Sequence, residues 1–336
     1  MEGQVAGVLA VLAGGVFQGS FMLPMKWTRR WEWENTWLIF ACTAYLLCPW
    51  LIVFATMPQI FQIYAASDVR SILTVLLFGV GWGIGAVTFG LGVEAVGLAL
   101  GFAVILGLAA CFGTLVPLLV LPQPGFSLAR SIVMGAALCS MLAGVAVCSF
   151  AGKWKEKGPR EKSALSYKSG LLMCVVSGVL SSCGNLGYVF GSNIMRNAQA
   201  MGVSIYLAPN AVWALLTLAL FTANAGYAIL LLRRNHSAAR FRERGTVRYF
   251  IYGALMGLLW MGGFVFYGAG TQRLGTLGPS LGWSILMSVM VLTSNILGLA
   301  TGEWTGAPTP AKRQLKIGIF WLLLAMGGLG YANRMP

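Results

Sequence analysis

The sequence predicts an all-α polytopic membrane protein with ten transmembrane helices. Hydrophobic residues occupy 58% of the 336 positions and charged residues only 10%, whereas a soluble domain carries about 25% charged residues. The apolar residues come in runs of roughly 20, the length that crosses the hydrocarbon core of a bilayer. Because lipid offers the backbone no hydrogen-bond partner, each of these runs must be helical.

Ten apolar runs follow one another, and the loops between them predict their orientation. The first, fifth, seventh and ninth loops hold most of the Lys and Arg residues behind the net charge of +14. Basic loops face the cytoplasm, so we expect the odd-numbered loops inside, both termini outside and no nucleic-acid partner. The runs are 5–25, 36–57, 71–91, 96–121, 129–151, 169–190, 204–232, 249–271, 277–301 and 315–333.

A glycine pattern in the third run recurs in the eighth without a gap. Weaker matches relate the first run to the sixth and the fifth to the tenth, which predicts two inverted five-helix repeats, 1–151 and 169–336, joined by a cytoplasmic linker, 152–168. Inverted repeats are typical of secondary transporters with a site near the membrane midplane, although close helix packing alone also explains many glycines. In and just after the third run, the residues Gly79, Trp82, Gly85, Val87, Phe89, Gly90, Gly92 and Gly97 correspond to Gly257, Trp260, Gly263, Val265, Tyr267, Gly268, Gly270 and Gly275.

The polar side chains inside the runs are neutral. All carboxylates lie at span ends or in loops, and we find no metal-ligand spacing, no cofactor motif and no enzyme motif. Amides and hydroxyls suit a ligand rich in hydroxyl groups, and aromatic rings can stack on a sugar, although helix–helix bonding is the simpler interpretation. We expect a substrate cavity lined by Gln18, Trp82, Thr88, Phe89, Asn185, Asn210, Trp260, Tyr267 and Ser284.

Several motifs together resemble the L-rhamnose–proton symporter family of the drug/metabolite transporter superfamily. They are LPMKWTRRWEWENTW, FGVGWGIGAVTFGL, GTLVPLL, APN, NAGY and WSILMS…LGLATGEW, and the resemblance runs nearly end to end. It implies ten helices in two inverted repeats and a cavity lined by spans one, three, four, six, eight and nine. It also implies uptake of L-rhamnose or a related deoxy sugar with protons, by alternating access, across the inner membrane. In span nine this chain has Pro279 and Leu286 where the family pattern implies an aspartate and a histidine.

Three other functions remain open from the sequence. A metabolite or drug exporter of the same superfamily would bind apolar amines in preference to sugars. An uncoupled sugar carrier would be indifferent to a pH gradient. A membrane receptor or assembly factor that transports nothing would leave the internal repeat unexplained.

Overall fold

The computed structural model describes residues 2–121, 127–155, 166–302, 304–332 and 335. Within these ranges ten helical segments are long and apolar enough to cross a membrane, and each overlaps one of the predicted runs. The described residues contain no strand. The predicted ten-span helical fold is therefore confirmed, while the predicted linker 152–168 lies largely outside the described residues.

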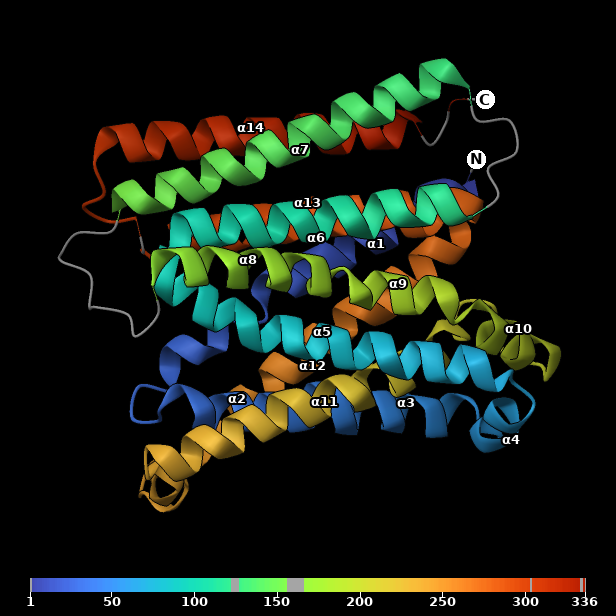
Figure 1. Cartoon of the computed structure of the whole chain (residues 1–336), viewed down its shortest axis with the longest axis horizontal. Coiled ribbons are helices and arrows are strands. Elements are labelled where there is room, and N and C mark those ends of the chain that lie inside the picture. Colours follow the sequence, from blue (N-terminus) through green and yellow to red (C-terminus); the bar gives the residue numbers. More distant parts are fainter. Residues whose placement is uncertain (1, 122–126, 156–165, 303, 333–334, 336) are drawn as a thin grey trace.

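Most spans are single helices, the first and ninth each include a short 3-10 segment, and the second and sixth are built from several segments. Figure 1 shows the long helices side by side, with both termini at one end of the molecule. The first half of the chain contains α1 (Glu2–Ser20), η1 (Leu23–Trp27), α2 (Trp33–Ala41), η2 (Cys42–Leu47), α3 (Cys48–Thr56), α4 (Ile60–Ala65), α5 (Val69–Val96), α6 (Leu98–Val120) and α7 (Leu128–Lys155). The second half contains α8 (Tyr167–Ser181), α9 (Cys183–Phe190), α10 (Ser192–Ala200), α11 (Pro209–Arg234), η3 (Ser237–Arg242), α12 (Val247–Arg273), η4 (Gly275–Leu277), α13 (Gly278–Ala300) and α14 (Thr309–Ala332).

The interrupted spans explain where the predicted boundaries differ from the structure. The second span contains a π-helical turn, η2, and the sixth breaks at Ser182 and again at Gly191. The sixth span continues as α10 beyond the predicted end at residue 190, because α10 is too polar to give an apolar signal. The seventh begins at Pro209 and not at residue 204, since proline is favoured in the first helical turn and excluded from the interior.

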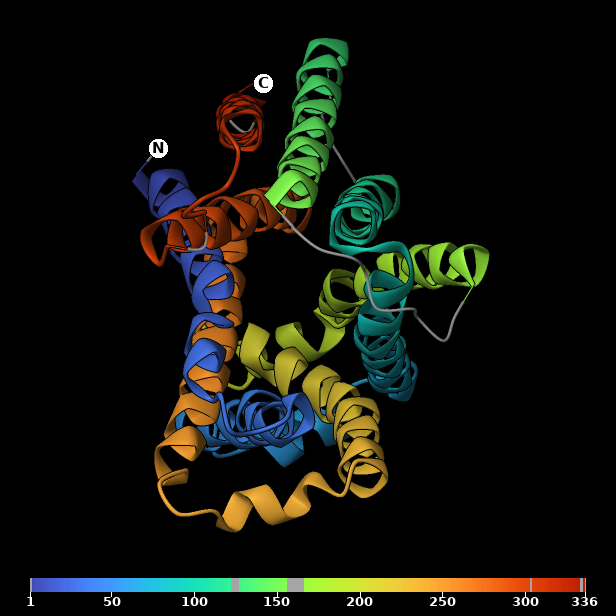
Figure 2. The same ribbon diagram turned by 90° about the vertical axis from the view of Figure 1, so that its left-hand side faces the viewer.

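Helices related by a shift of five spans make matching contacts. Helix α5 packs on α8 and α11, while its counterpart α12 packs on α1 and α2. Likewise α6 packs on α7 and α8, and its counterpart α13 packs on α14 and α1. The pairs α7 with α14 and α6 with α13 join each helix to its own counterpart. These principal contacts therefore recur in the two halves of the chain. Figure 2 shows the helices arranged around the middle of the molecule, viewed from one end of the bundle.

Several of the recurring glycines lie where these helices cross. A Cβ added at Gly85 would lie 3.0 Å from backbone atoms of Leu180 in α8, and one added at Gly263 would lie 3.0 Å from the carbonyl oxygen of Gly14 in α1. Small residues at such crossings let two backbones approach closely in lipid. Similar close contacts are made by Gly79 and Gly92 in α5 and by Gly257 and Gly270 in α12.

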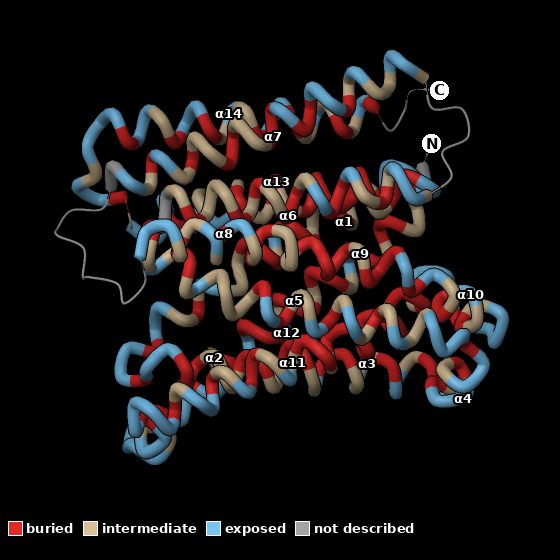
Figure 3. Tube along the Cα trace, in the orientation of Figure 1, coloured by how far each residue is buried: buried red, intermediate tan, exposed pale blue. Residues whose placement is uncertain are grey.

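Apolar side chains also cover much of the outer surface. Leu119 is 85% exposed and Leu77 is 72% exposed. Figure 3 shows exposed residues along the outer helices and at the ends of the molecule, with buried residues concentrated in the middle. Ten membrane-length helices with apolar outer faces form a multi-pass membrane protein, in which lipid covers these side chains.

We predict that Gly85→Val and Gly263→Val both lower the stability of the folded protein. Each new side chain would collide with a neighbouring backbone, and overpacking of this kind costs about 1–3 kcal/mol. The expected result is a lower apparent melting temperature for both variants in detergent, measured by size-exclusion chromatography after heating. Gly226→Val in α11 is the control, because a Cβ there meets nothing within 4 Å. Equal stability of all three variants would contradict the role of the crossings.

Candidate functional site

A cavity of about 930 Å³ lies at the centre of the helix bundle. This volume falls within the range of small-molecule sites, roughly 300–1,000 Å³. Its described lining comes from every span except α14. The six spans implied by the family resemblance all take part, and the second, fifth and seventh spans contribute as well.

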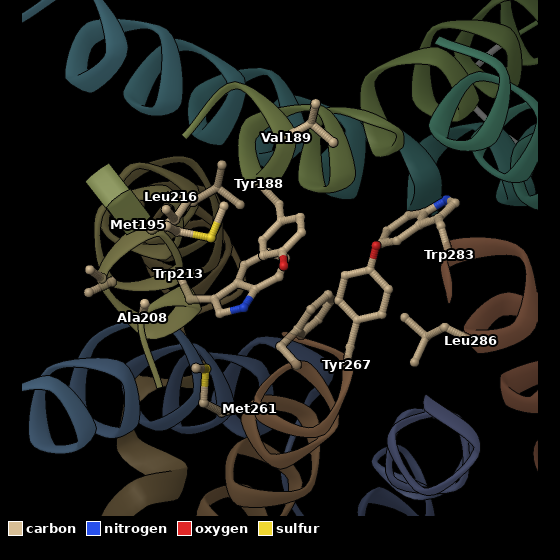
Figure 4. Close-up of a cluster of buried hydrophobic side chains, with 14 of the residues drawn as sticks. Tyr188, Val189, Met195, Ala208, Trp213, Leu216, Met261, Tyr267, Trp283 and Leu286 are labelled. Atoms are coloured by element: carbon tan, nitrogen blue, oxygen red, sulfur yellow. The ribbon is translucent and has the colours of Figure 1, made fainter. Parts of the chain in front are cut away.

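The cavity opens toward the end of the molecule that carries the odd-numbered loops. Met22, Glu94, Gly152 and Leu231 line it, and each lies near the odd-loop end of its span. Trp304, which also lines it, belongs to the ninth loop itself. None of the described lining residues lies at the opposite end of the bundle. Toward that end the side chains of Tyr188, Trp213 and Tyr267, drawn in Figure 4, are buried.

Two tryptophans related by the internal repeat form the deep part of the cavity. The rings of Trp82 in α5 and Trp260 in α12 lie 5.5 Å apart between centroids, and both line the cavity. Tyr45, from the π-helical turn η2, packs edge-on against Trp260 at 4.8 Å. On the other side, Gly184 of α9 leaves room for the Trp82 ring, since a Cβ there would lie 3.0 Å from it. The tryptophan pair is therefore held by both halves of the chain.

Neutral amides supply the polar part of the lining. Gln18 donates from Nε2 to the carbonyl oxygen of Trp260 at 2.8 Å, while its own amide oxygen accepts no hydrogen bond from any described residue. Asn295 donates to the carbonyl of Val291 at 2.8 Å, and Asn224 accepts from the indole of Trp37 at 3.1 Å. Each of these amides therefore keeps hydrogen-bonding capacity for a ligand. Gln18, Asn224 and Asn295 all line the cavity, together with Ser181 and Ser294.

The structure divides the predicted site residues into two groups. Four of them line the cavity: Gln18, Trp82, Phe89 and Trp260. The other five lie outside the lining: Thr88, Asn185, Asn210, Tyr267 and Ser284.

The residues outside the lining have other partners. Thr88 donates to the carbonyl of Ile84 in its own helix at 2.8 Å, and the Ser284 hydroxyl lies 2.6 Å from that of Thr114. Asn185 and Tyr267 are fully buried and hydrogen-bonded to each other. Asn210 is 1% exposed, and its amide oxygen has no partner among the described residues.

Some lining residues were not predicted from the sequence. Glu94 is the one charged side chain in the described lining. It was not predicted as a site residue because it lies at a span end, where α5 finishes. The available signal was its position three residues before Gly97, the glycine at which α5 ends. Asn224 and Tyr45 were also missed; the first lies near the odd-loop end of α11, and the second depends on the π-helical turn.

One pair of repeat-related glycines shows how the two ends differ. A Cβ at Gly90 would meet nothing within 4 Å, and Gly90 lines the cavity. A Cβ at its counterpart Gly268 would lie 2.8 Å from Pro209 and 3.1 Å from the indole nitrogen of Trp213. Of these two equivalent glycines, Gly90 at the open end has free space beside it and Gly268 at the closed end is tightly packed.

We predict that a cysteine at position 294 reacts with a membrane-impermeant thiol reagent from the odd-loop face only. Ser294 is exposed and lines the cavity. Ser288→Cys is the control, since Ser288 lies in the same helix but is fully buried. Labelling rates are measured in a variant without the seven native cysteines. Equal labelling of both positions would show that the cavity does not open as described.

The comparisons with known proteins agree with this architecture. The family model described as L-rhamnose-proton symport protein (RhaT) matches residues 2–333. The chain is 29% identical over 343 aligned residues to the L-rhamnose-proton symporter of Yersinia pestis (strain Pestoides F), covering 98% of each chain. The L-rhamnose-proton symporter of Yersinia pseudotuberculosis serotype O:1b (strain IP 31758) is similar to the same extent, with 29% identity and 98% coverage of each chain. The chain therefore belongs to the L-rhamnose-proton symport protein family.

Proposed function

We propose that this protein is a secondary active transporter of the inner membrane that takes up L-rhamnose or a related deoxy sugar together with protons. The central cavity, with its tryptophan pair and its neutral amides, is the observation that carries the proposal. The relatives of similar length are named L-rhamnose-proton symporters. Sugar and proton are therefore the proposed substrates, and transport proceeds by alternating access.

The lining suits a small neutral ligand with hydroxyl groups. Sugar hydroxyls donate and accept hydrogen bonds, as do the amides of Gln18, Asn224 and Asn295. The faces of Trp82 and Trp260 supply an apolar surface for the C–H face and the methyl group of a deoxy sugar. The described lining contains no basic side chain and one carboxylate, Glu94. Such a lining has no cationic group to hold an anionic ligand, which favours a neutral sugar over an anionic substrate.

The transport cycle follows from the division into inverted repeats, 1–151 and 169–336, joined by 152–168. The helix contacts of α5 resemble those of α12, and the contacts of α6 resemble those of α13, which supports this division. An odd number of spans in each half places the halves upside down relative to each other, and such halves move about a central site. With the odd loops in the cytoplasm, as their Lys and Arg content favours, the described state is the one that releases sugar to the cell interior.

Uptake of labelled L-rhamnose into proteoliposomes tests the proposal. With an inward-directed proton gradient, we expect accumulation above the external concentration, and a protonophore should abolish it. Liposomes without protein are the control. Equilibration that is indifferent to the gradient would rule out proton coupling and leave an uncoupled carrier. No uptake of any deoxy sugar would overturn the proposed function.

We predict that Trp260→Ala and Gln18→Ala both weaken sugar transport. Each removes a contact from the wall of the cavity, and a loss of about 1–2 kcal/mol of binding free energy raises the KM roughly 5–30-fold. The measurement is the concentration dependence of L-rhamnose counterflow. Thr222→Ala in α11 is the control, because its hydroxyl bonds only to a carbonyl of its own helix. A KM unchanged in both cavity variants would exclude this wall from sugar binding.

A further inference from the structure

A buried polar cluster lies one helical turn beyond the deep end of the cavity. On each of four helices, a cavity-lining residue is followed about one turn deeper by a cluster residue. Ala109, Ser181, Phe264 and Trp283 line the cavity, and the corresponding cluster residues are Gly113, Asn185, Tyr267 and Pro279. We call these last four residues the Asn185 cluster. It joins α6, α9, α12 and α13.

The cluster exists because a proline leaves a backbone carbonyl without its helical partner. Pro117 lies inside α6 and has no N–H group to donate to the carbonyl of Gly113. Asn185 of α9 supplies the missing donor, with a distance of 2.7 Å from Nδ2 to the carbonyl oxygen. An unsatisfied carbonyl in the membrane would be costly, so this contact ties the fourth span to the sixth.

The remaining groups of Asn185 bind the other two helices. Its Nδ2 also donates to the carbonyl of Pro279 at 3.0 Å, and its amide oxygen accepts a hydrogen bond from the Tyr267 hydroxyl. Asn185 and Tyr267 are both 0% exposed. Every hydrogen-bonding group of the Asn185 side chain is therefore occupied by one of three neighbouring spans.

A second layer closes the bundle beyond the cluster. The Tyr188 hydroxyl lies 2.7 Å from that of Thr271 and accepts from Gln272 at 2.8 Å. The ring of Tyr188 stacks on Trp213 at 5.2 Å, and Trp213 lies 6.1 Å from Tyr267. Figure 4 shows Tyr188, Trp213 and Tyr267 gathered in this layer. The passage toward the even-loop end is thus shut by side chains of the second half of the chain.

Among the polar side-chain atoms that are buried without a partner in the described residues, three lie in α11 and α13 near the even-loop end. They are the Asn210 amide oxygen, the Trp213 indole nitrogen and the Ser280 hydroxyl. Buried polar groups are nearly always hydrogen-bonded, so these groups are unusual in the state described here. They would gain partners if water or a polar ligand entered from the even-loop end.

We propose that the Asn185 cluster is the gate on the even-loop side, and that Asn185 and Tyr267 bind the hydroxyl groups of the sugar when this gate opens. In the closed state the two side chains bond to each other and to backbone carbonyls. Separation of the helices leaves these groups without partners, which is unfavourable unless others replace them. Sugar hydroxyls can replace both donors and acceptors, so sugar binding stabilises the open gate. This proposal rests on the proposed sugar transport.

A cysteine at position 280 reports on the gate. Ser280 is fully buried beside Pro279, and Ser→Cys removes no side-chain hydrogen bond to a described residue. In a full-length variant without the seven native cysteines, we expect slow labelling of Ser280→Cys by an impermeant thiol reagent from the even-loop face. Adding Asn185→Ala should raise the labelling rate about tenfold, because each lost buried hydrogen bond favours opening. Tyr267→Phe should raise it less.

Asn35→Ala is the matched control for labelling. Asn35 is also a fully buried asparagine, but it bonds to the Ser237 carbonyl at the odd-loop end. Its replacement should leave labelling at position 280 unchanged. Tyr267→Phe removes a single oxygen atom and keeps the test valid if Asn185→Ala does not fold. Unchanged labelling in folded Tyr267→Phe and Asn185→Ala would overturn the gate.

Protection by sugar tests the second part of the proposal. L-rhamnose should slow the labelling of Ser280→Cys, and Tyr267→Phe should raise the half-protecting concentration roughly tenfold, as expected for a lost hydrogen bond to the ligand. A purely structural Tyr267 would leave this concentration unchanged or lower it, since a weaker gate opens more often. That result would overturn the role in sugar binding. If the wild-type chain transports no sugar at all, the proposed function fails, while the labelling result on the gate is unaffected.

Discussion

The backbone in a membrane must satisfy its hydrogen bonds inside the protein, and the central region of this molecule depends on that constraint. Helix α6 contains Pro117, which frees the carbonyl of Gly113, and the sixth span breaks next to Ser182. Both irregularities lie near the deep end of the cavity, where Asn185 bonds to the freed carbonyl. Polar groups can therefore exist in the middle of an apolar bundle, because irregular backbone and polar side chains satisfy each other.

Residues from both halves of the chain form this central region. Each supplies one tryptophan of the central pair, and the amide of Gln18 in the first half bonds to the backbone beside Trp260 in the second. The Asn185 cluster likewise combines Gly113 from the first half with three residues from the second. In the proposed transport cycle, a site built from both halves responds to movement between them, because such a movement changes the spacing of the groups proposed to bind the ligand.

Much of the fold could be predicted from the sequence, because a membrane span needs only length and apolar composition. Trp82 and Trp260 were both predicted to line the cavity, and both do so, with their rings in contact. Asn185 and Tyr267 were expected to face the cavity, but they bond to each other and to backbone carbonyls, which no pattern of side chains reveals. Glu94 was missed for a different reason. Glu94 lines the cavity because the cavity extends to the end of α5 in the conformation described here. The sequence does not tell in which conformation a span end is open.

The contrast between Gly90 and Gly268 has a consequence for the evolution of the chain. In the proposed cycle the odd-loop end must at some point become as compact as the even-loop end, and Gly90 would then take the crowded surroundings that Gly268 has now. A larger residue at position 90 fits without difficulty in the conformation described here. Natural selection would nevertheless act against it, because the larger side chain would collide with its neighbours in the opposite conformation. The requirement for a small residue at position 90 thus comes from the opposite conformation, in which the space now vacant beside Gly90 would be filled.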